Sequence, residues 1–187
     1  MASVAAISSA PIIARAATTS IDVTAQFLNA ITLANEVNMD FATVEFSAAP
    51  AGGDTATLGT NGTITYAGNF SGAGTGTAGE VEITGGTVGQ TVEIFCDVSA
   101  TLARTGGGTI NADDIRVSFT AGAPGAGSAC NGVAGAAATT RVLAGGGADV
   151  ILFGGRLNGA TAASFVAGSY SSANAGGNDI QVDVFYQ

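Results

Sequence analysis

The chain has 187 residues and a formal net charge of −9; 47% of its residues are hydrophobic and only 10% are charged. It contains no His and no Lys, so Ser–His–Asp and Cys–His catalysis, imidazole metal ligands, lysine Schiff bases and phosphate-loop lysines are excluded. The negative charge opposes binding to nucleic acids and anionic lipids, and no apolar run reaches the roughly 18 residues of a membrane-spanning helix. We therefore expect no enzyme, no cofactor, no nucleic-acid partner and no membrane span.

Residues 1–16 differ in composition from the rest of the chain. The triplet Ala14-Arg15-Ala16 resembles the small-residue motif at a signal-peptide cleavage site, but a basic start is missing and Pro11 interrupts the apolar run. The segment is therefore either the remnant of a secretion signal or an apolar N-terminal extension. Residues 17–187 are expected to form a single domain, because their number suffices for one sizeable core.

Residues 18–27 alternate strictly between apolar and polar side chains, which predicts a β-strand with one buried face. The apolar face consists of Ile21, Val23, Ala25 and Phe27. This strand could belong to its own sandwich, or it could be added to the sheet of a neighbouring subunit. If it belongs to its own sandwich, residues 3–16 become the spare segment, with Val4, Ala6, Ala10 and Ile12 as smaller apolar side chains.

A series of short strands follows, with turn signals between them. The pattern predicts strands at 31–33, 41–46, 55–60, 63–68, 79–85, 90–98, 114–120, 141–143, 149–153 and 163–170. Asn61-Gly62 lies between two β-rich runs, which is typical of a type I′ hairpin turn. We find no convincing helix pattern.

The chain closes on the clearest alternation in the sequence. Ile180, Val182, Val184 and Tyr186 are expected to point one way, and Asp179, Gln181 and Asp183 the other. The strands together predict an all-β fold, an antiparallel β-sandwich.

Cys96 and Cys130 are the only cysteines. A disulfide between them would close a loop of about 35 residues and stabilise the fold by roughly 3–4 kcal/mol. The alternative is two buried thiols. A bridge would indicate an oxidising compartment.

Two stretches suggest calcium. Asn111, Asp113 and Asp114 are expected in a turn, where they could offer oxygen ligands or simply bond the nearby backbone. Residues 144–152, AGGGADVIL, approach a calcium-binding nonapeptide, but a glycine-rich turn leading into a strand is the simpler interpretation.

Several short motifs are similar to a known family. They are NMDFATV (38–44), EVEITG (80–85), LFGGRL (152–157), AGSYSS (167–172) and VDVFY (182–186). They resemble a secreted bacterial β-domain family of unknown function, and the closing pattern is similar to spore-coat-protein-U-like and chaperone–usher-type pilins. Ala42 and Ser172 stand where the family usually has Gly. The resemblance implies secretion, an Ig-like sandwich and assembly at the cell surface.

The leading hypothesis is a non-enzymatic subunit of an extracellular, pilus-like fibre. Identical subunits would be its partners, joined by N-terminal strand exchange; the need for a secretion chaperone stays open. The alternatives are a monomeric secreted surface-binding module for glycan or Ca²⁺, and an acid-pair hydrolase, for which no carboxylate pair stands out.

Overall fold

The computed structural model describes residues 24–187, and this part of the chain is all-β. The strands are β1 (Leu33–Val37), β2 (Val44–Phe46), β3 (Thr55–Leu58), β4 (Ile64–Ala67), β5 (Phe70–Gly72), β6 (Gly79–Ile83), β7 (Thr91–Cys96), β8 (Ala100–Arg104), β9 (Thr109–Ser118), β10 (Ser128–Ala129), β11 (Thr139–Val142), β12 (Val150–Ala163), β13 (Tyr170–Ser171) and β14 (Val182–Tyr186). No described residue lies in a helix.

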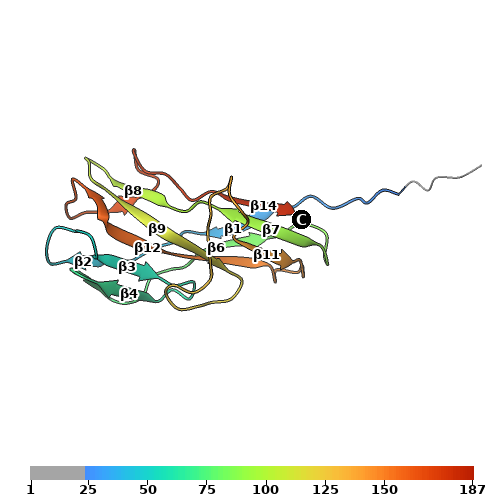
Figure 1. Cartoon of the computed structure of the whole chain (residues 1–187), viewed down its shortest axis with the longest axis horizontal. Helices are drawn as coiled ribbons and strands as arrows, with labels where there is room; N and C mark the ends of the chain where they lie inside the picture. The colour runs from blue at the N-terminus through green and yellow to red at the C-terminus, as the bar shows by residue number, and fades with distance from the viewer. Residues whose placement is uncertain (1–23) are drawn as a thin grey trace, which may run out of the picture.

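The strands form antiparallel sheets. The largest sheet has the order β1-β6-β12-β9-β8-β13, with β3 and β4 beside β12 and β10 beside β9. A second sheet has the order β11-β7-β14, and β2 pairs with β5. Figure 1 shows an elongated molecule in which the N-terminal segment and the C-terminus lie at one end, while β2 and β8 lie toward the other.

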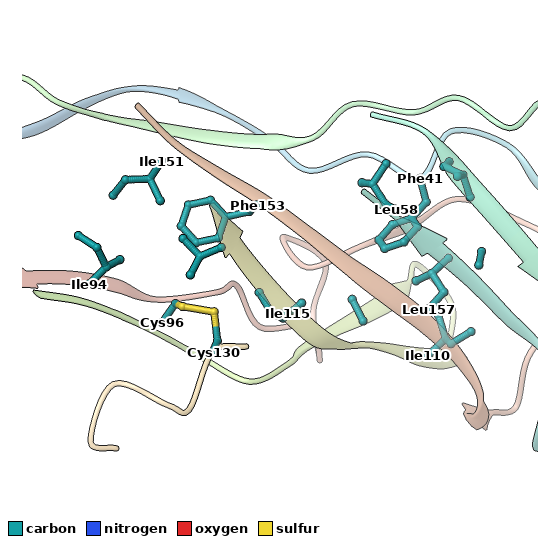
Figure 2. Packing of buried hydrophobic residues seen from close by; sticks show 14 of the residues in the cluster. Phe41, Leu58, Ile94, Cys96, Ile110, Ile115, Cys130, Ile151, Phe153 and Leu157 are labelled. Atoms are coloured by element: carbon teal, nitrogen blue, oxygen red, sulfur yellow. A yellow bond between two sulfur atoms is a disulfide. The ribbon is translucent and has the colours of Figure 1, made fainter. Parts of the chain in front are cut away.

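The core lies between the two larger sheets. Val92, Ile94 and Cys96 of β7 are fully buried, with 0% of their surface exposed. In Figure 2, Ile94 and Cys96 lie opposite Ile151 and Phe153 of the large sheet. This layered arrangement is consistent with a β-sandwich and agrees with the expected antiparallel all-β fold.

The expected disulfide is present. The sulfur atoms of Cys96 and Cys130 are bonded at 1.98 Å, and both residues are buried. The bridge joins the end of β7 to the segment that follows β10, at the bottom of the core in Figure 2.

The last strand also forms as predicted. β14 pairs with β7, from Val182 opposite Cys96 to Tyr186 opposite Val92. Its apolar face, together with Ile180 just before the strand, packs against the core. The alternation of the closing residues therefore predicted both the strand and its buried face.

The predicted strands at 149–153 and 163–170 are wrong in their bounds. One continuous strand of 14 residues, β12, runs from Val150 to Ala163 and pairs with β6, β9 and β3. Gly154 and Gly155 continue the strand, and a Cβ on Gly154 would lie 2.5 Å from the backbone oxygen of Leu58. Glycine is thus used for close backbone approach within the sheet rather than for a turn.

The β3–β4 hairpin forms, but its turn is not type I′. Gly62 donates its N–H to the carbonyl of Gly59 at 3.0 Å, so Thr60 and Asn61 are the central residues of the turn. A type I′ turn centred on Asn61-Gly62 needs positive φ at both, and Asn61 is not among the described non-glycine residues with positive φ. Its side chain instead accepts the N–H of Thr63 at 3.0 Å.

The strand predicted at residues 18–27 is absent from these sheets in the part that the structure describes, residues 24–27. Residues 24–27 lie outside every strand, and β1 begins only at Leu33. Residues 18–23 lie outside the described part of the chain.

Candidate functional site

An open groove of about 1170 Å³ runs beside β1 and the start of β14. Buried core side chains line it: Phe41, Ile110, Ala112, Phe153 and Leu157. A groove that reaches the hydrophobic core offers apolar contacts to whatever occupies it.

Edge strands border the groove on both sides. β1 pairs only with β6 and β14 only with β7 among the described strands. Leu33 and Val37 of β1 line the groove and are 36% and 43% exposed. Ile180 and Val182 line it from the side of β14. Apolar side chains and unpaired strand edges thus coincide in one place.

The backbone of β14 is oriented toward an additional strand. Gln181 accepts the N–H of Asp97 at 3.1 Å, and Gln187 donates its N–H to Thr91 at 3.1 Å, so both direct their backbone groups toward β7. Backbone groups of successive strand residues point to alternate edges, and those of Val182, the first residue of β14, therefore point away from β7. A strand added there would find hydrogen-bond partners.

Three aromatic side chains form one end of the groove, which we call the aromatic end. The ring centroids of Phe46 and Phe165 are 5.2 Å apart, and those of Phe165 and Tyr170 are 4.8 Å apart. Tyr170 is fixed by its hydroxyl, which donates to the carbonyl of Val166 at 2.9 Å. All three residues fall in strands that the sequence predicts, at 41–46 and 163–170, but no local pattern indicates that their rings meet, because Phe46 is more than 100 positions from the other two.

The charged residues that line the groove are all acidic. They are Glu36, Asp40, Glu80 and Asp179. None of the arginines in the described part of the chain lines it. The groove therefore combines an apolar floor with a negative border.

The N-terminal segment is anchored to its own domain at Asn29, and the exposed side chain of Gln26 makes a longer hydrogen bond to Gln90, at 3.4 Å. The N–H of Asn29 donates to Thr87 Oγ1 at 2.8 Å, and its carbonyl accepts the hydroxyl of Tyr186 at 2.7 Å. Just before this anchor, Ala25 is exposed and Phe27 is 91% exposed. The other candidate strand residues, Val4, Ala6, Ala10, Ile12, Ile21 and Val23, lie outside the described residues.

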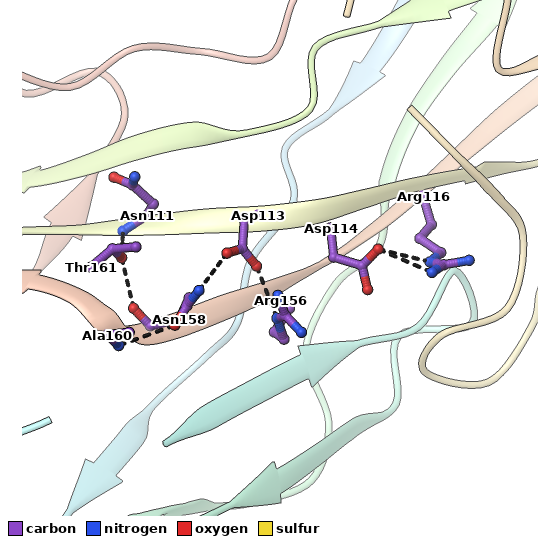
Figure 3. Close-up of polar contacts among 8 residues, drawn as sticks. All are labelled: Asn111, Asp113, Asp114, Arg116, Arg156, Asn158, Ala160 and Thr161. Carbon is purple, nitrogen blue, oxygen red and sulfur yellow. Dashed lines mark hydrogen bonds and ion pairs between the residues drawn. The ribbon is translucent and has the colours of Figure 1, made fainter. Parts of the chain in front are cut away.

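The suggested calcium residues lie within β9 and not in a turn. Figure 3 shows Asp113 bonded to Arg156, at 2.9 Å, and Asp114 bonded to Arg116, at 3.0 Å. Asp114 has φ +47, beside an irregularity in the pairing of β9 with β12. The pattern of neighbouring Asx residues suggested a turn, but here it marks a β-bulge, which Asp tolerates because its short side chain allows positive φ.

The two carboxylates are thus paired with guanidinium groups. Asn111 lies on the same strand, and its side-chain oxygen, the atom that could bind a cation, accepts the hydroxyl of Thr101 at 3.1 Å. Among residues 24–187, no group of three or more His, Cys, Asp or Glu side chains could hold a metal ion.

The glycine-rich stretch at 144–148 is a turn built around Asp149, whose side chain is 1% exposed. Its carboxylate accepts the N–H groups of Ala144 and Gly145 and pairs with Arg141 at 3.0 Å. Burial alone raises the pKa of Asp149, but the hydrogen bonds from Gly145, Arg141 and Ala144 outweigh it and hold the pKa below its ordinary value.

A second buried carboxylate, Asp54, joins the turn before β3 to the turn between β4 and β5. Asp54 accepts the N–H of Asn69 and the N–H of Ala51, both at 2.8 Å. These bonds, that of Asn69 first, lower the pKa of Asp54. Asp54 and Asp149 therefore have structural roles.

Residues 24–187 contain no helix that is long and apolar enough to cross a bilayer. The disulfide fits a protein of an oxidising compartment, extracellular or periplasmic. Comparison of the chain with protein-family models, curated proteins and solved structures finds no match.

Proposed function

We propose that the chain is a non-enzymatic structural subunit of an extracellular fibre, in which the N-terminal strand of one copy fills the groove of the next. One observation carries this proposal: an apolar groove lies open between two strand edges, while the N-terminal ribbon of the same molecule, where it is described at residues 24–28, lies outside every strand and leaves Phe27 exposed. Each copy thus offers both halves of one contact.

The energetics favour such an exchange. An unpaired strand edge over an open core is an aggregation hazard, and an added strand removes it by supplying main-chain hydrogen bonds. The apolar side chains of the added strand would gain about 25 cal/mol for each Å² buried. Because the groove and the ribbon are different surfaces, the contact is head to tail and extends into an open filament.

The resemblance of the sequence to pilins suggests a more specific type of sandwich and of assembly. An Ig-like, pilin-like sandwich with its last edge open would suit the groove beside β14. Ala42, which stands where the resembling family usually has Gly, has φ +52, in the left-handed region that glycine favours. Secretion to the cell surface suits the disulfide, and a secretion chaperone that shields the groove before assembly belongs among the expected partners. Fold likeness alone does not establish function, so the proposal depends on the groove.

The test blocks the groove and leaves the ribbon intact. Ala167 is exposed and lines the groove, so Ala167→Trp should fill it. Purified wild-type protein is expected to form filaments, visible by electron microscopy and as high-mass species by size exclusion, whereas Ala167→Trp alone should stay monomeric. The matched control is Ala134→Trp on another exposed turn, which should polymerise like the wild type.

A mixture of wild-type and Ala167→Trp protein provides a second test of the groove. A blocked subunit can still donate its ribbon, so adding Ala167→Trp protein to wild-type protein should cap one filament end and shorten the filaments. Wild-type protein that stays monomeric at high concentration, or filaments that Ala167→Trp does not affect, would overturn the proposal and leave a monomeric secreted module.

A further inference from the structure

Phe27 is the most exposed of the large hydrophobic residues in the described part of the chain, at 91%. Leu28 beside it is 39% exposed. Burying a Phe side chain is worth about 1.5–3 kcal/mol, so a partner surface that covers this ring would gain that free energy.

We infer that residues 21–27 are the donated strand and that Phe27 of one copy enters the aromatic end of the next copy's groove. This inference rests on the proposed fibre. It assigns the segment, its direction and the contact of its largest side chain.

The anchor at Asn29 sets the direction. Phe27 lies two residues before Asn29, so it stays within about 7 Å of its own domain. It must therefore occupy the part of the neighbour's groove that faces the donor subunit. Ile21, six positions earlier, reaches further in.

The position of the aromatic end in the molecule matches this requirement. Figure 1 shows the N-terminal segment leaving at the end where β14 finishes, and β2 and β8 toward the opposite end. Phe46 lies in β2, and Tyr170 pairs with Arg104 of β8, so the aromatic end lies there. In a head-to-tail row of equally oriented copies, the departing segment of one copy meets the aromatic end of the next.

The same arrangement gives the donated strand a pairing partner. The donated strand would have Phe27, its last residue, at the aromatic end and Ile21 further along the groove. β14 runs the opposite way, from Val182 near the groove to Tyr186 near the C-terminus of the chain, so the two strands would be antiparallel. The backbone groups of Val182 that point away from β7 are available to the donated strand. Its strand from Ile21 to Phe27 spans about 20 Å at 3.3 Å per residue.

The other candidate segment suits the groove less well. Pro11 has no N–H and interrupts a ladder, and Ala6 and Ala10 are small. If Val4 to Ile12 were donated instead, Phe27 would remain in the linker with nothing to cover it.

Disulfide trapping in the full-length chain distinguishes these possibilities. Both native cysteines are bonded to each other, so introduced cysteines are the only free thiols. Ser169 and Glu36 are exposed and line the groove, Ser169 next to Tyr170 at the aromatic end and Glu36 on β1. Mild oxidation of Phe27→Cys/Ser169→Cys protein should give a ladder of crosslinked multimers on a non-reducing gel. The matched double variant Phe27→Cys/Glu36→Cys should give at least tenfold less.

The reciprocal pairs complete the design. Ile21→Cys is expected to crosslink with Glu36→Cys in preference to Ser169→Cys. If Phe27→Cys crosslinked mainly with Glu36→Cys, and Ile21→Cys mainly with Ser169→Cys, the proposed direction of the donated strand in the groove would be wrong. Crosslinks from Ile12→Cys that exceed those from Phe27→Cys would overturn the segment, while the fibre proposal would stand. If none of these pairs crosslinks and the wild type forms no filaments, the fibre proposal fails as well.

Discussion

At the scale of single residues, two buried carboxylates stabilise turns, and in the sequence these turns are recognisable only by their glycines. Asp149 accepts two backbone N–H groups and pairs with Arg141, and Asp54 accepts two further backbone N–H groups. The glycine-rich stretch before Asp149 predicted a turn, and this is correct. The partner Arg141 was not predictable, because only the pairing of β11 with β7 brings it into place.

The pKa shifts make stability sensitive to acid. The pKa values of Asp54 and Asp149 are lower in the folded chain than in the unfolded chain, so their stabilisation is complete above about pH 4 and is lost as the pH falls through the folded values. We expect Asp149→Asn to lower the free energy of unfolding by about 2 kcal/mol at pH 7 and to flatten its fall below pH 4. Urea denaturation from pH 7 to pH 2 measures both effects.

The control for this prediction is Glu45→Gln, which alters an exposed carboxylate on β2. It should stay within about 0.5 kcal/mol of the wild type at pH 7. An Asp149→Asn protein with the same acid dependence as the wild type would contradict the role assigned to this side chain.

At the scale of elements, alternation predicted strands well where one face is buried and the other wet. β7 alternates between half-buried and buried residues, and in β14 the predicted apolar residues Val182, Val184 and Tyr186 pack against the core. The pattern failed for β12, because the glycines inside it resemble turn signals, although burial alternates along the strand on both sides of Gly154 and Gly155.

Gly154 tests this account of β12. A Cβ there would meet the backbone oxygen of Leu58, and backbone cannot swing aside as a side chain can. Gly154→Ala is expected to separate β3 from β12 and to lower the free energy of unfolding by about 2 kcal/mol, measured by urea denaturation. Gly52→Ala, where no atom lies within 4 Å of the added Cβ, should be close to neutral. Equal stability of the two variants would refute the close approach.

At the scale of the whole molecule, charge should control how fast copies meet. Each copy has a net charge of −9, and all charged residues that line the groove are acidic. Identical subunits therefore repel one another, and salt screens this repulsion, with a Debye length of about 10 Å at 0.1 M and about 3 Å at 1 M. We expect the initial rate of polymerisation, followed by light scattering, to rise about threefold or more between 0.05 and 0.5 M NaCl.

Substituting carboxylates in the groove measures how much they contribute to the salt dependence of the polymerisation rate. Glu36→Gln/Glu80→Gln protein should polymerise faster at low salt and respond less to added salt. A rate that falls with salt would mean that attraction between opposite charges, and not screened repulsion, governs the encounter.

The sequence by itself determined the all-β class, the two cysteines available for a disulfide, the apolar face of the last strand and the absence of histidine and lysine side chains. These follow from composition and from a period of two, which are local properties of the chain. Only the tertiary structure decided that β1 and β14 are both edge strands and that Phe46, Phe165 and Tyr170 meet at one end of a groove. Strand order and the gaps between sheets depend on contacts between residues far apart in sequence, which no local pattern encodes.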